Sequence, residues 1–334
     1  MGFKGAMRSW EASMRRQERE AKRRQRELEK QHKELEKMQE LQRAQYEVKV
    51  YENRIDLLLS VHKESGKIWD WEAIKSSNPP TKPIRHGRKE HFAQSKLNQY
   101  KPGIFDKLFK KEESKRNVLK KSVEEARQLD EREYQNTLQE YGDQCSDWVT
   151  TVELAKKILT GDIKAYMDAI KKVDPFSEIS SLGSSIGFKA VNSTLFEASL
   201  HVNSEQVIPN EVKTLLKSGK LSVKKMPQGK FNELYQDYVC GCVLRVAREL
   251  FALLPINIVI VTAFANLLNT QTGYMQNQPI LSIAIPKKTL SQLNFGTIDP
   301  SDSMNNFIHK INFRKTIGFN AVESIKPTDL KPNY

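Results

Sequence analysis

Residues 231–262 have the sequence FNELYQDYVCGCVLRVARELFALLPINIVIVT. Its first part has apolar residues at helical spacing, which predicts one long buried helix from Phe231 to about Leu254. Pro255 then ends the helix, and the β-branched run after it predicts a buried strand from Ile256 to Thr262. A helix that leads directly into a buried strand is typical of a domain in which helices pack on a sheet.

Further strand patterns lie on both sides of this stretch. Residues 184–191 and 195–202 flank a short polar turn and predict a hairpin. Other strands are expected at 221–226, 279–285, 311–313 and 319–322, with a short helix at 287–293. The order of these elements predicts an α+β fold for residues 173–334, with a largely antiparallel sheet and helices on one face.

The uncharged stretch 250–268 is almost long enough to cross a bilayer. Pro255 divides it, and Asn257, Thr262 and Asn266 interrupt its apolar character. We therefore expect the end of a helix followed by a buried strand here, and no membrane span.

Residues 1–62 predict a long basic helix, because no proline or glycine occurs between Arg8 and Val61. Apolar residues recur in steps of three, four or seven at Leu28, Leu35, Met38, Leu41, Ala44, Val48, Tyr51, Ile55 and Leu58. This spacing favours an imperfect coiled-coil seam, since a strict heptad is not kept throughout.

Between Arg8 and Gln31, at the start of this helix, apolar residues are few and basic ones are many. Interleaved glutamates supply ion pairs at helical spacing, so one interpretation is a solvent-exposed helix held by its own charges. The other is a basic tip that binds the phosphates of nucleic acid. Under that hypothesis the binding residues are Arg15, Arg16, Arg19, Lys22, Arg23, Arg24 and Arg26.

A second helical pattern covers residues 112–172, with one apolar face. We expect this segment to pack on the first helix as an antiparallel hairpin. The alternative is a homodimer through the first helix, and the sequence does not distinguish between the two. Residues 63–111 lie between the helices, contain a proline-rich loop, and predict an irregular basic connector.

Two further groups of basic residues lie in the C-terminal part. Arg245 and Arg248 are one turn apart on the predicted main helix, with Gly241 on the same side. They either pair with an acid on a neighbouring element that Gly241 allows to approach, or form a fork that binds phosphate. The second group lies on and around a predicted strand and can extend such a basic surface. It consists of Lys220, Lys224, Lys225 and Lys230.

The chain has no nucleotide-binding loop, serine-hydrolase motif, zinc-peptidase motif or dinucleotide fingerprint. A metal-dependent nuclease is the one enzymatic hypothesis, with Asp299, Asp302, His309 and Glu197 as candidate ligands. No strand has the acid-x-Lys pair typical of such enzymes, and the two aspartates also fit a helix-capping turn. We therefore assign no catalytic or metal-binding residue, and we expect no cofactor.

Three cysteines, Cys145, Cys240 and Cys242, do not make a disulfide framework, which indicates a reducing compartment. The N-terminus has no apolar segment of the kind found in secretory signals. From both features we expect a cytoplasmic protein.

These patterns together predict a non-catalytic interaction or assembly protein with a net charge of +13. Its basic surfaces are expected to contact nucleic acid or an acidic protein. The coiled coil is expected to join copies of the chain or to hold a second protein. The nuclease is the alternative function, and it differs in its need for a divalent ion.

Overall fold

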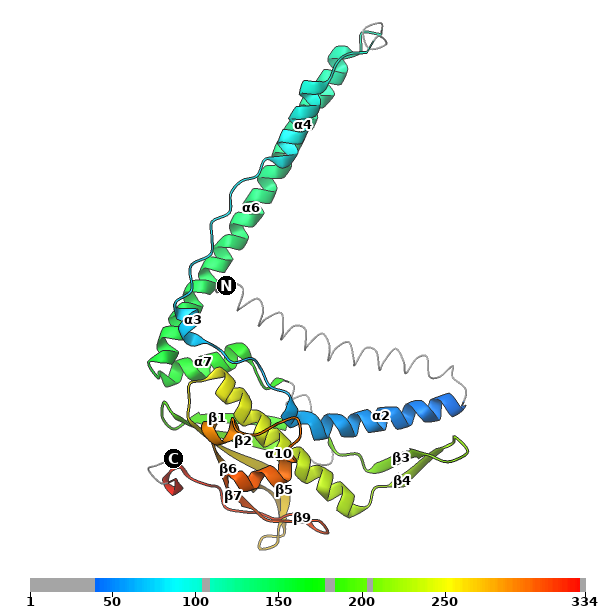
Figure 1. Ribbon diagram of the computed structural model, residues 1–334, viewed down its shortest axis with the longest axis vertical. Coiled ribbons are helices and arrows are strands. Elements are labelled where there is room, and N and C mark those ends of the chain that lie inside the picture. The colour runs from blue at the N-terminus through cyan, green and yellow to red at the C-terminus, as the bar shows by residue number, and fades with distance from the viewer. Residues whose placement is uncertain (1–39, 104–108, 178–183, 203–206, 331–334) are drawn as a thin grey trace. The chain divides into compact units, whose positions relative to one another are not determined.

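The computed structural model describes residues 40–103, 109–177, 184–202 and 207–330 (Figure 1). These residues form two compact units. One contains residues 72–155, and the other contains the described residues before 72 and after 155. The α+β class expected from the sequence is confirmed, because long helices accompany a five-stranded sheet.

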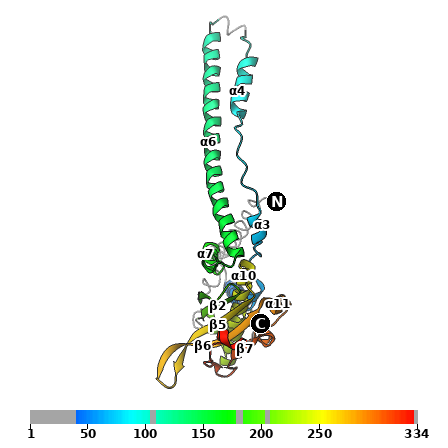
Figure 2. The same ribbon diagram turned by 90° about the vertical axis from the view of Figure 1, so that its left-hand side faces the viewer.

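The first unit is an arm of two helices that lie side by side (Figures 1 and 2). They are α4 (Arg88–Gln99) and α6 (Glu112–Leu159), whose last residues belong to the second unit. Asp130 on α6 is buried, and its carboxylate accepts hydrogen bonds from the backbone N–H groups of Lys89 (3.3 Å) and Glu90 (2.8 Å). Gly87, the N-cap of α4, makes no side-chain cap, so Asp130 caps α4 from the neighbouring helix.

The connector differs from the expectation that residues 63–111 are irregular. It contains α4 and also the short helix α3 (Trp71–Lys75). The sequence of α4 has few apolar residues, and its stabilising contacts come from α6, which a local pattern cannot show. The expected packing of residues 112–172 on the first helix stays a prediction.

The second unit is built on a sheet with the strand order β1-β2-β5-β6-β7. Its strands are β1 (Ser184–Ala190), β2 (Leu195–Val202), β5 (Ile258–Asn269), β6 (Tyr274–Pro286) and β7 (Ile308–Ile311). Every neighbouring pair is antiparallel except β2 and β5, which are parallel. The chain between these two strands includes α10 (Gln228–Leu253), a crossover of the kind that parallel strands require. The largely antiparallel sheet is thus confirmed.

Smaller elements complete the second unit. They are α2 (Glu40–Ser60), α7 (Ile163–Val173), α11 (Lys287–Leu290), α12 (Pro300–Ser303), β3 (Glu211–Leu215), β4 (Leu221–Lys225), β8 (Phe313–Arg314) and β9 (Gly318–Phe319). The strands expected at 311–313 and 319–322 correspond to β8 and β9, which pair with each other. β3 and β7 were not expected from the sequence, and β7 joins the main sheet. Both strands are short, so their positions depend on contacts with other elements more than on a local pattern.

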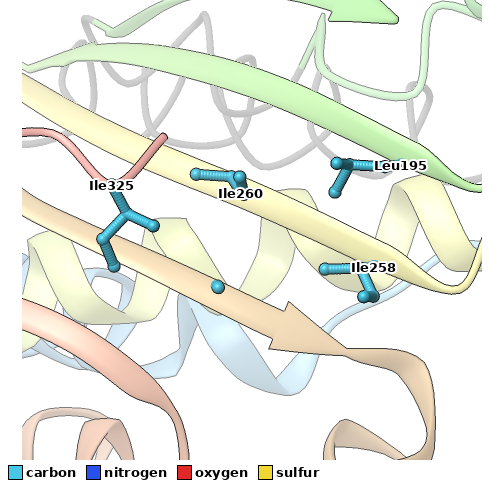
Figure 3. Close-up of a cluster of buried hydrophobic side chains, with 5 residues drawn as sticks. Leu195, Ile258, Ile260 and Ile325 are labelled. Carbon is cyan, nitrogen blue, oxygen red and sulfur yellow. The ribbon is translucent and has the colours of Figure 1, made fainter. Parts of the chain in front are cut away.

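The sheet is covered on both faces. Helix α10 lies on one side, where alternating β2 residues such as Phe196 and Leu200 are fully buried. On the other side the C-terminal segment brings Ile325 onto the strands, as Figure 3 shows. The cluster there contains Leu195, Ile258, Ile260, Ala284 and Ile325.

A buried hydroxyl pair fixes this C-terminal segment. The hydroxyl oxygens of Thr262 and Ser282 lie 2.8 Å apart on neighbouring strands. The Ser282 Oγ also accepts a hydrogen bond of 2.9 Å from the backbone N–H of Ile325. Polar groups buried in the sheet therefore satisfy a backbone donor that would otherwise be unpaired.

The uncharged stretch 250–268 is divided between the end of α10 and the strand β5, as expected. None of the helices in the described ranges combines the length and apolarity needed to cross a membrane. β5 and β6 are longer than the predicted strands, and their additional residues form a two-stranded ribbon. This ribbon extends beyond the ends of the neighbouring strands (Figure 2).

Candidate nucleic-acid interface

The candidate phosphate-binding residues fall into two groups. Those of the N-terminal tip, Arg15, Arg16, Arg19, Lys22, Arg23, Arg24 and Arg26, lie outside the described residues. The other four, Lys224, Lys225, Arg245 and Arg248, lie in the second unit. The structure gives these four residues two different environments.

The described part of the first helix, α2, packs on α10 and on the strands β3 and β4. Its buried residues Ala44, Val48 and Leu58 belong to the predicted seam. Lys213 on β3 forms an ion pair with Glu47 on α2, with Nζ and Oε2 3.1 Å apart. Within the described residues, these three seam positions therefore pack inside this unit, whereas Leu41 of the same seam is half exposed.

The strands β3 and β4 form a separate antiparallel hairpin that projects away from the main sheet (Figure 1). Its turn contains Gly219 at φ 79°, a left-handed conformation that suits glycine. Lys213 and its cross-strand neighbour Val223 are on the face toward α2, because Lys213 contacts that helix. Lys224 follows Val223 in the strand, so its side chain points to the opposite face.

Five exposed lysines lie on this hairpin and directly after it. They are Lys217, Lys220, Lys224, Lys225 and Lys230, and we call them the hairpin lysines. Within the described part of the chain, none of the five has an ion-pair partner. The hairpin itself, residues 211–225, contains a single acidic residue, Glu211. Its charge is therefore strongly positive and faces solvent.

The hairpin leads directly into the N-terminus of α10. Pro227 is the N-cap and supplies no side-chain cap, and the first turn contains no acidic residue. The unpaired N–H groups and the dipole of this 26-residue helix favour an anion at this end. Lys315 packs against Gly229 and contacts Glu233 at 2.5 Å, so its charge is already paired. The helix end and the hairpin lysines thus favour the same kind of ligand, a phosphate group.

Arg245 is buried and has its partners within the protein. Its side chain is 5% exposed, with Nε 2.6 Å from Oε1 of Glu249 and Nη1 3.5 Å from Oε2 of Glu64. A β-carbon on Gly241 would lie 3.8 Å from the backbone nitrogen of His62, so the segment approaches closely there. The structure therefore favours the alternative in which Arg245 pairs with an acid on a neighbouring element, and not a phosphate fork.

Arg248 holds the same segment. It donates hydrogen bonds to the carbonyl of His62 (2.5 Å) and the hydroxyl of Ser65 (2.7 Å). Its guanidinium also lies over the ring of Phe295, 3.9 Å from the centroid. We therefore remove Arg248, together with Arg245, from the interface, because these contacts occupy both side chains.

The residue that completes this arrangement is Glu249, which the sequence analysis missed. Its two carboxylate oxygens accept hydrogen bonds from the backbone N–H of Gly66 at 2.9 and 3.1 Å. A β-carbon on Gly66 would lie 2.7 Å from one of these oxygens, so only glycine fits without a shift. We call residues 62–66 the strap, since they bind along α10. The spacing of Arg245 and Glu249, one helical turn apart, was the signal that could have identified the pair.

The residues of the nuclease hypothesis are engaged in separate contacts. Asp299 caps α12, and its Oδ1 accepts hydrogen bonds from the N–H groups of Ser301 (2.9 Å) and Asp302 (3.0 Å). Glu197 lies 3.5 Å from Lys189 on the neighbouring strand, and His309 contacts the carbonyl of Phe307. In the described ranges, no group of three His, Cys, Asp or Glu side chains could hold a metal ion.

Two titratable groups near α12 have pKa values shifted from their ordinary values. The pKa of Asp237 is raised to about 6, mainly by burial and also by the nearby carboxylates of Asp299, Glu233 and Asp302, against the opposing effect of a hydrogen bond with Ser301. Burial also lowers the pKa of the His62 imidazole, so this ring favours its neutral form. Both groups lie where the strap and α12 approach α10, which makes this contact sensitive to protonation.

The hairpin lysines and the N-terminus of α10 are therefore the features that the structure brings together. Lys220, Lys224, Lys225 and Lys230 could be identified from the sequence, whereas Lys217 could not, because β3 was not recognised as a strand. Comparison of the chain with protein-family models, with curated proteins and with solved structures finds no match.

Proposed function

We propose that the protein is a non-catalytic interaction protein whose hairpin lysines bind the phosphates of nucleic acid. One observation carries this proposal: four exposed lysines without ion-pair partners in the described residues lie on one projecting hairpin, and a fifth, Lys230, lies in the first turn of the helix that follows it. By contrast, Lys189, Lys310 and Lys315 each contact a glutamate. The unpaired lysines keep their charge available for an external polyanion.

The shape of the hairpin supports nucleic acid as the partner. A two-stranded β-ribbon is narrow enough to enter the major groove of B-DNA. Lys220 and Lys224 are four residues apart along an extended strand, or about 13 Å, which corresponds to about four base pairs of duplex. Lysines at such spacing contact phosphates and carry no information about base sequence. Binding through this surface is therefore expected to be independent of sequence.

Fluorescence anisotropy with a labelled duplex, measured over a salt series in EDTA, tests the proposal. We expect binding at low salt that weakens steeply as salt increases, because bound counterions are released. Replacing Lys224 and Lys225 by alanine should reduce the slope of log K against log salt by about two. The matched control replaces Lys287 and Lys288, two adjacent exposed lysines on α11, and should leave the slope nearly unchanged.

The possible results separate the hypotheses. An equal loss in both double variants would show that only net charge matters and would remove the hairpin from the interface. Absence of binding at low salt would exclude nucleic acid and leave an acidic protein as the partner. Cleavage of the duplex that requires Mg²⁺ would instead support the nuclease, and an Asp299→Ala or Asp302→Ala variant should then abolish it.

A further inference from the structure

Residues 250–286 contain no Asp, Glu, Lys, Arg or His, although 28% of the whole chain is Asp, Glu, Lys or Arg. Burial explains the absence of charged residues at the end of α10 and in the parts of β5 and β6 that lie within the five-stranded sheet. It does not explain residues 265–278, where the two strands form the ribbon shown in Figure 2. In the described ranges, β2 pairs with β5 only as far as Phe264, and β7 pairs with β6 from Leu281 to Ala284.

One face of the ribbon carries an exposed apolar pair. Leu268 and Met275 are directly opposite each other in the strand register, and each is 58% exposed. The next pair on this face, Asn266 and Asn277, is also exposed. Phe264 follows on the same face and stacks on a histidine of β2. This side of the ribbon therefore presents apolar and amide groups without any charge.

Such a surface is unusual for an element exposed to water. Natural proteins commonly protect exposed strands with lysine or other charged residues, because an open strand otherwise associates with another chain. Here the ribbon has no charged side chain at all. Exposed apolar side chains on an unprotected ribbon are typical of a contact surface.

We propose that this face of the ribbon associates with the same face of a second copy of the chain. Each copy has a net charge of +13, so most contacts between two copies bring like charges together. A contact between the ribbons avoids this repulsion. The exposed amide of Asn266 contains both donors and an acceptor, so it can pair with an identical group, whereas Nδ2 of Asn277 already lies 3.0 Å from Nδ1 of His201 on β2.

The symmetry of such a contact defines its geometry. In a two-fold arrangement, one surface meets an identical surface, and each cross-contact occurs twice. Leu268 then packs on the partner's Met275, and Met275 packs on the partner's Leu268. A charge introduced at either position is consequently buried twice without a partner.

Sedimentation velocity of the full chain over a range of protein concentrations tests the association. We expect a dimer whose dissociation constant changes little with salt, because the contact is uncharged. Leu268→Lys and Met275→Glu should each raise that constant at least about tenfold, since an unpaired charge is buried. Tyr274→Lys changes the opposite face of the ribbon, which makes it the control, and should leave the constant within about twofold.

Mixing the two disrupted variants tests the proposed pairing. The lysine introduced by Leu268→Lys in one chain then meets the glutamate introduced by Met275→Glu in the other, and the second cross-contact stays apolar. Native mass spectrometry should detect a heterodimer in the mixture although each variant alone is monomeric.

A monomeric wild-type chain would overturn the proposal. So would a Leu268→Lys variant that still forms the dimer, which would place the contact elsewhere, for example on the first helix. Failure of the mixture to associate would overturn the two-fold pairing. Thermal unfolding of each variant shows whether it keeps its fold, and Tyr274→Lys provides the reference for a charge added to the ribbon.

Discussion

Glu249 joins α10 to the strap in the second unit. Its carboxylate contacts Arg245 on its own helix at 2.6 Å and the backbone N–H of Gly66 on the strap at 2.9 Å. Both charged side chains are almost completely buried, at 4% and 5% exposure. A buried charge that loses a close partner is strongly destabilising, so the strap and α10 depend on this carboxylate.

We therefore expect Glu249→Ala to lower the free energy of unfolding by about 3–5 kcal/mol, measured by chemical denaturation. The loss leaves the guanidinium of Arg245 buried next to a cavity. Glu323→Ala is the control, because Glu323 also contacts a lysine but is 91% exposed. This variant should change the free energy by less than about 1 kcal/mol. Similar effects in both variants would show that the buried pair does not hold the strap.

The titration of Asp237 makes the stability of the second unit depend on pH. Its pKa rises from an ordinary value of 3.8 to about 6 on folding, mainly through burial. The folded state therefore binds the proton of the Asp237 carboxyl more tightly than the unfolded state does. This proton binding contributes to the free energy of unfolding at low pH, and the contribution is lost as the pH rises through about 6. The charged form is thus unfavourable at neutral pH.

Asp237→Asn should relieve this unfavourable charge. We expect the variant to be more stable than the wild type by about 1–2 kcal/mol near pH 8, a value reduced because the carboxyl is only half-buried. The two proteins should have nearly equal stability at low pH, below about 3, where Asp237 is protonated in both states. Thermal unfolding across this pH range measures the difference, and the titration of His62 cancels because both proteins contain it. A variant that is less stable near pH 8 would contradict the expected sign.

Single residues also show what the sequence could predict. The spacing of Arg245, Arg248 and Gly241 indicated a close approach of another element, and that element is the strap. Its identity could not be predicted, because the strap lies far away in the sequence and has no pattern of its own. The structure favours ion pairing over the phosphate fork, because Glu249, one turn away, and the distant strap occupy both arginines.

At the scale of elements, α4 depends on a cap from another helix. Asp130 accepts hydrogen bonds from two N–H groups in the first turn of α4, and Gly87 provides no side chain for this purpose. Asp130→Ala should remove the cap and destabilise α4 by about 1–2 kcal/mol. Amide hydrogen exchange should then become faster in residues 88–99, with little change in α6.

The control for this prediction is Asp143→Ala, which removes an exposed carboxylate from the same helix. It should leave exchange in α4 unchanged. Equal exchange rates in α4 of the wild type and the Asp130→Ala variant would show that the helix is stabilised by other contacts. The two ion pairs between the connector and α6, Arg85 with Glu131 and Lys89 with Glu133, are the first candidates.

The elements that the sequence predicted have strong patterns of their own. Regular apolar spacing is present in α10, β1, β2 and the start of β5. This spacing places apolar side chains on the buried face of each element, so it can be recognised without knowing the neighbouring elements. α4 and β3 were missed because Asp130 and α2, respectively, supply their stabilising contacts. The ribbon was missed because its amide and apolar residues follow no regular alternation and most of them are exposed.

At the scale of the molecule, the second unit presents two surfaces of opposite chemistry. The hairpin lysines form a charged surface proposed to bind phosphate, and the ribbon forms an uncharged surface proposed to bind its own copy. They lie on different elements and share no residue. Substitutions on the two surfaces should therefore have independent effects.

This independence can be measured with one set of variants. The alanine variant of Lys224 and Lys225 should lose affinity for nucleic acid and keep the sedimentation behaviour of the wild type. Met275→Glu should become monomeric and keep its affinity for a duplex short enough to contact a single hairpin. If the monomeric variant also lost its affinity for the short duplex, one hairpin would not be enough for binding, and phosphate binding would require both copies. If the lysine variant became monomeric, the copies would associate through the charged surface, and the ribbon would not be the contact.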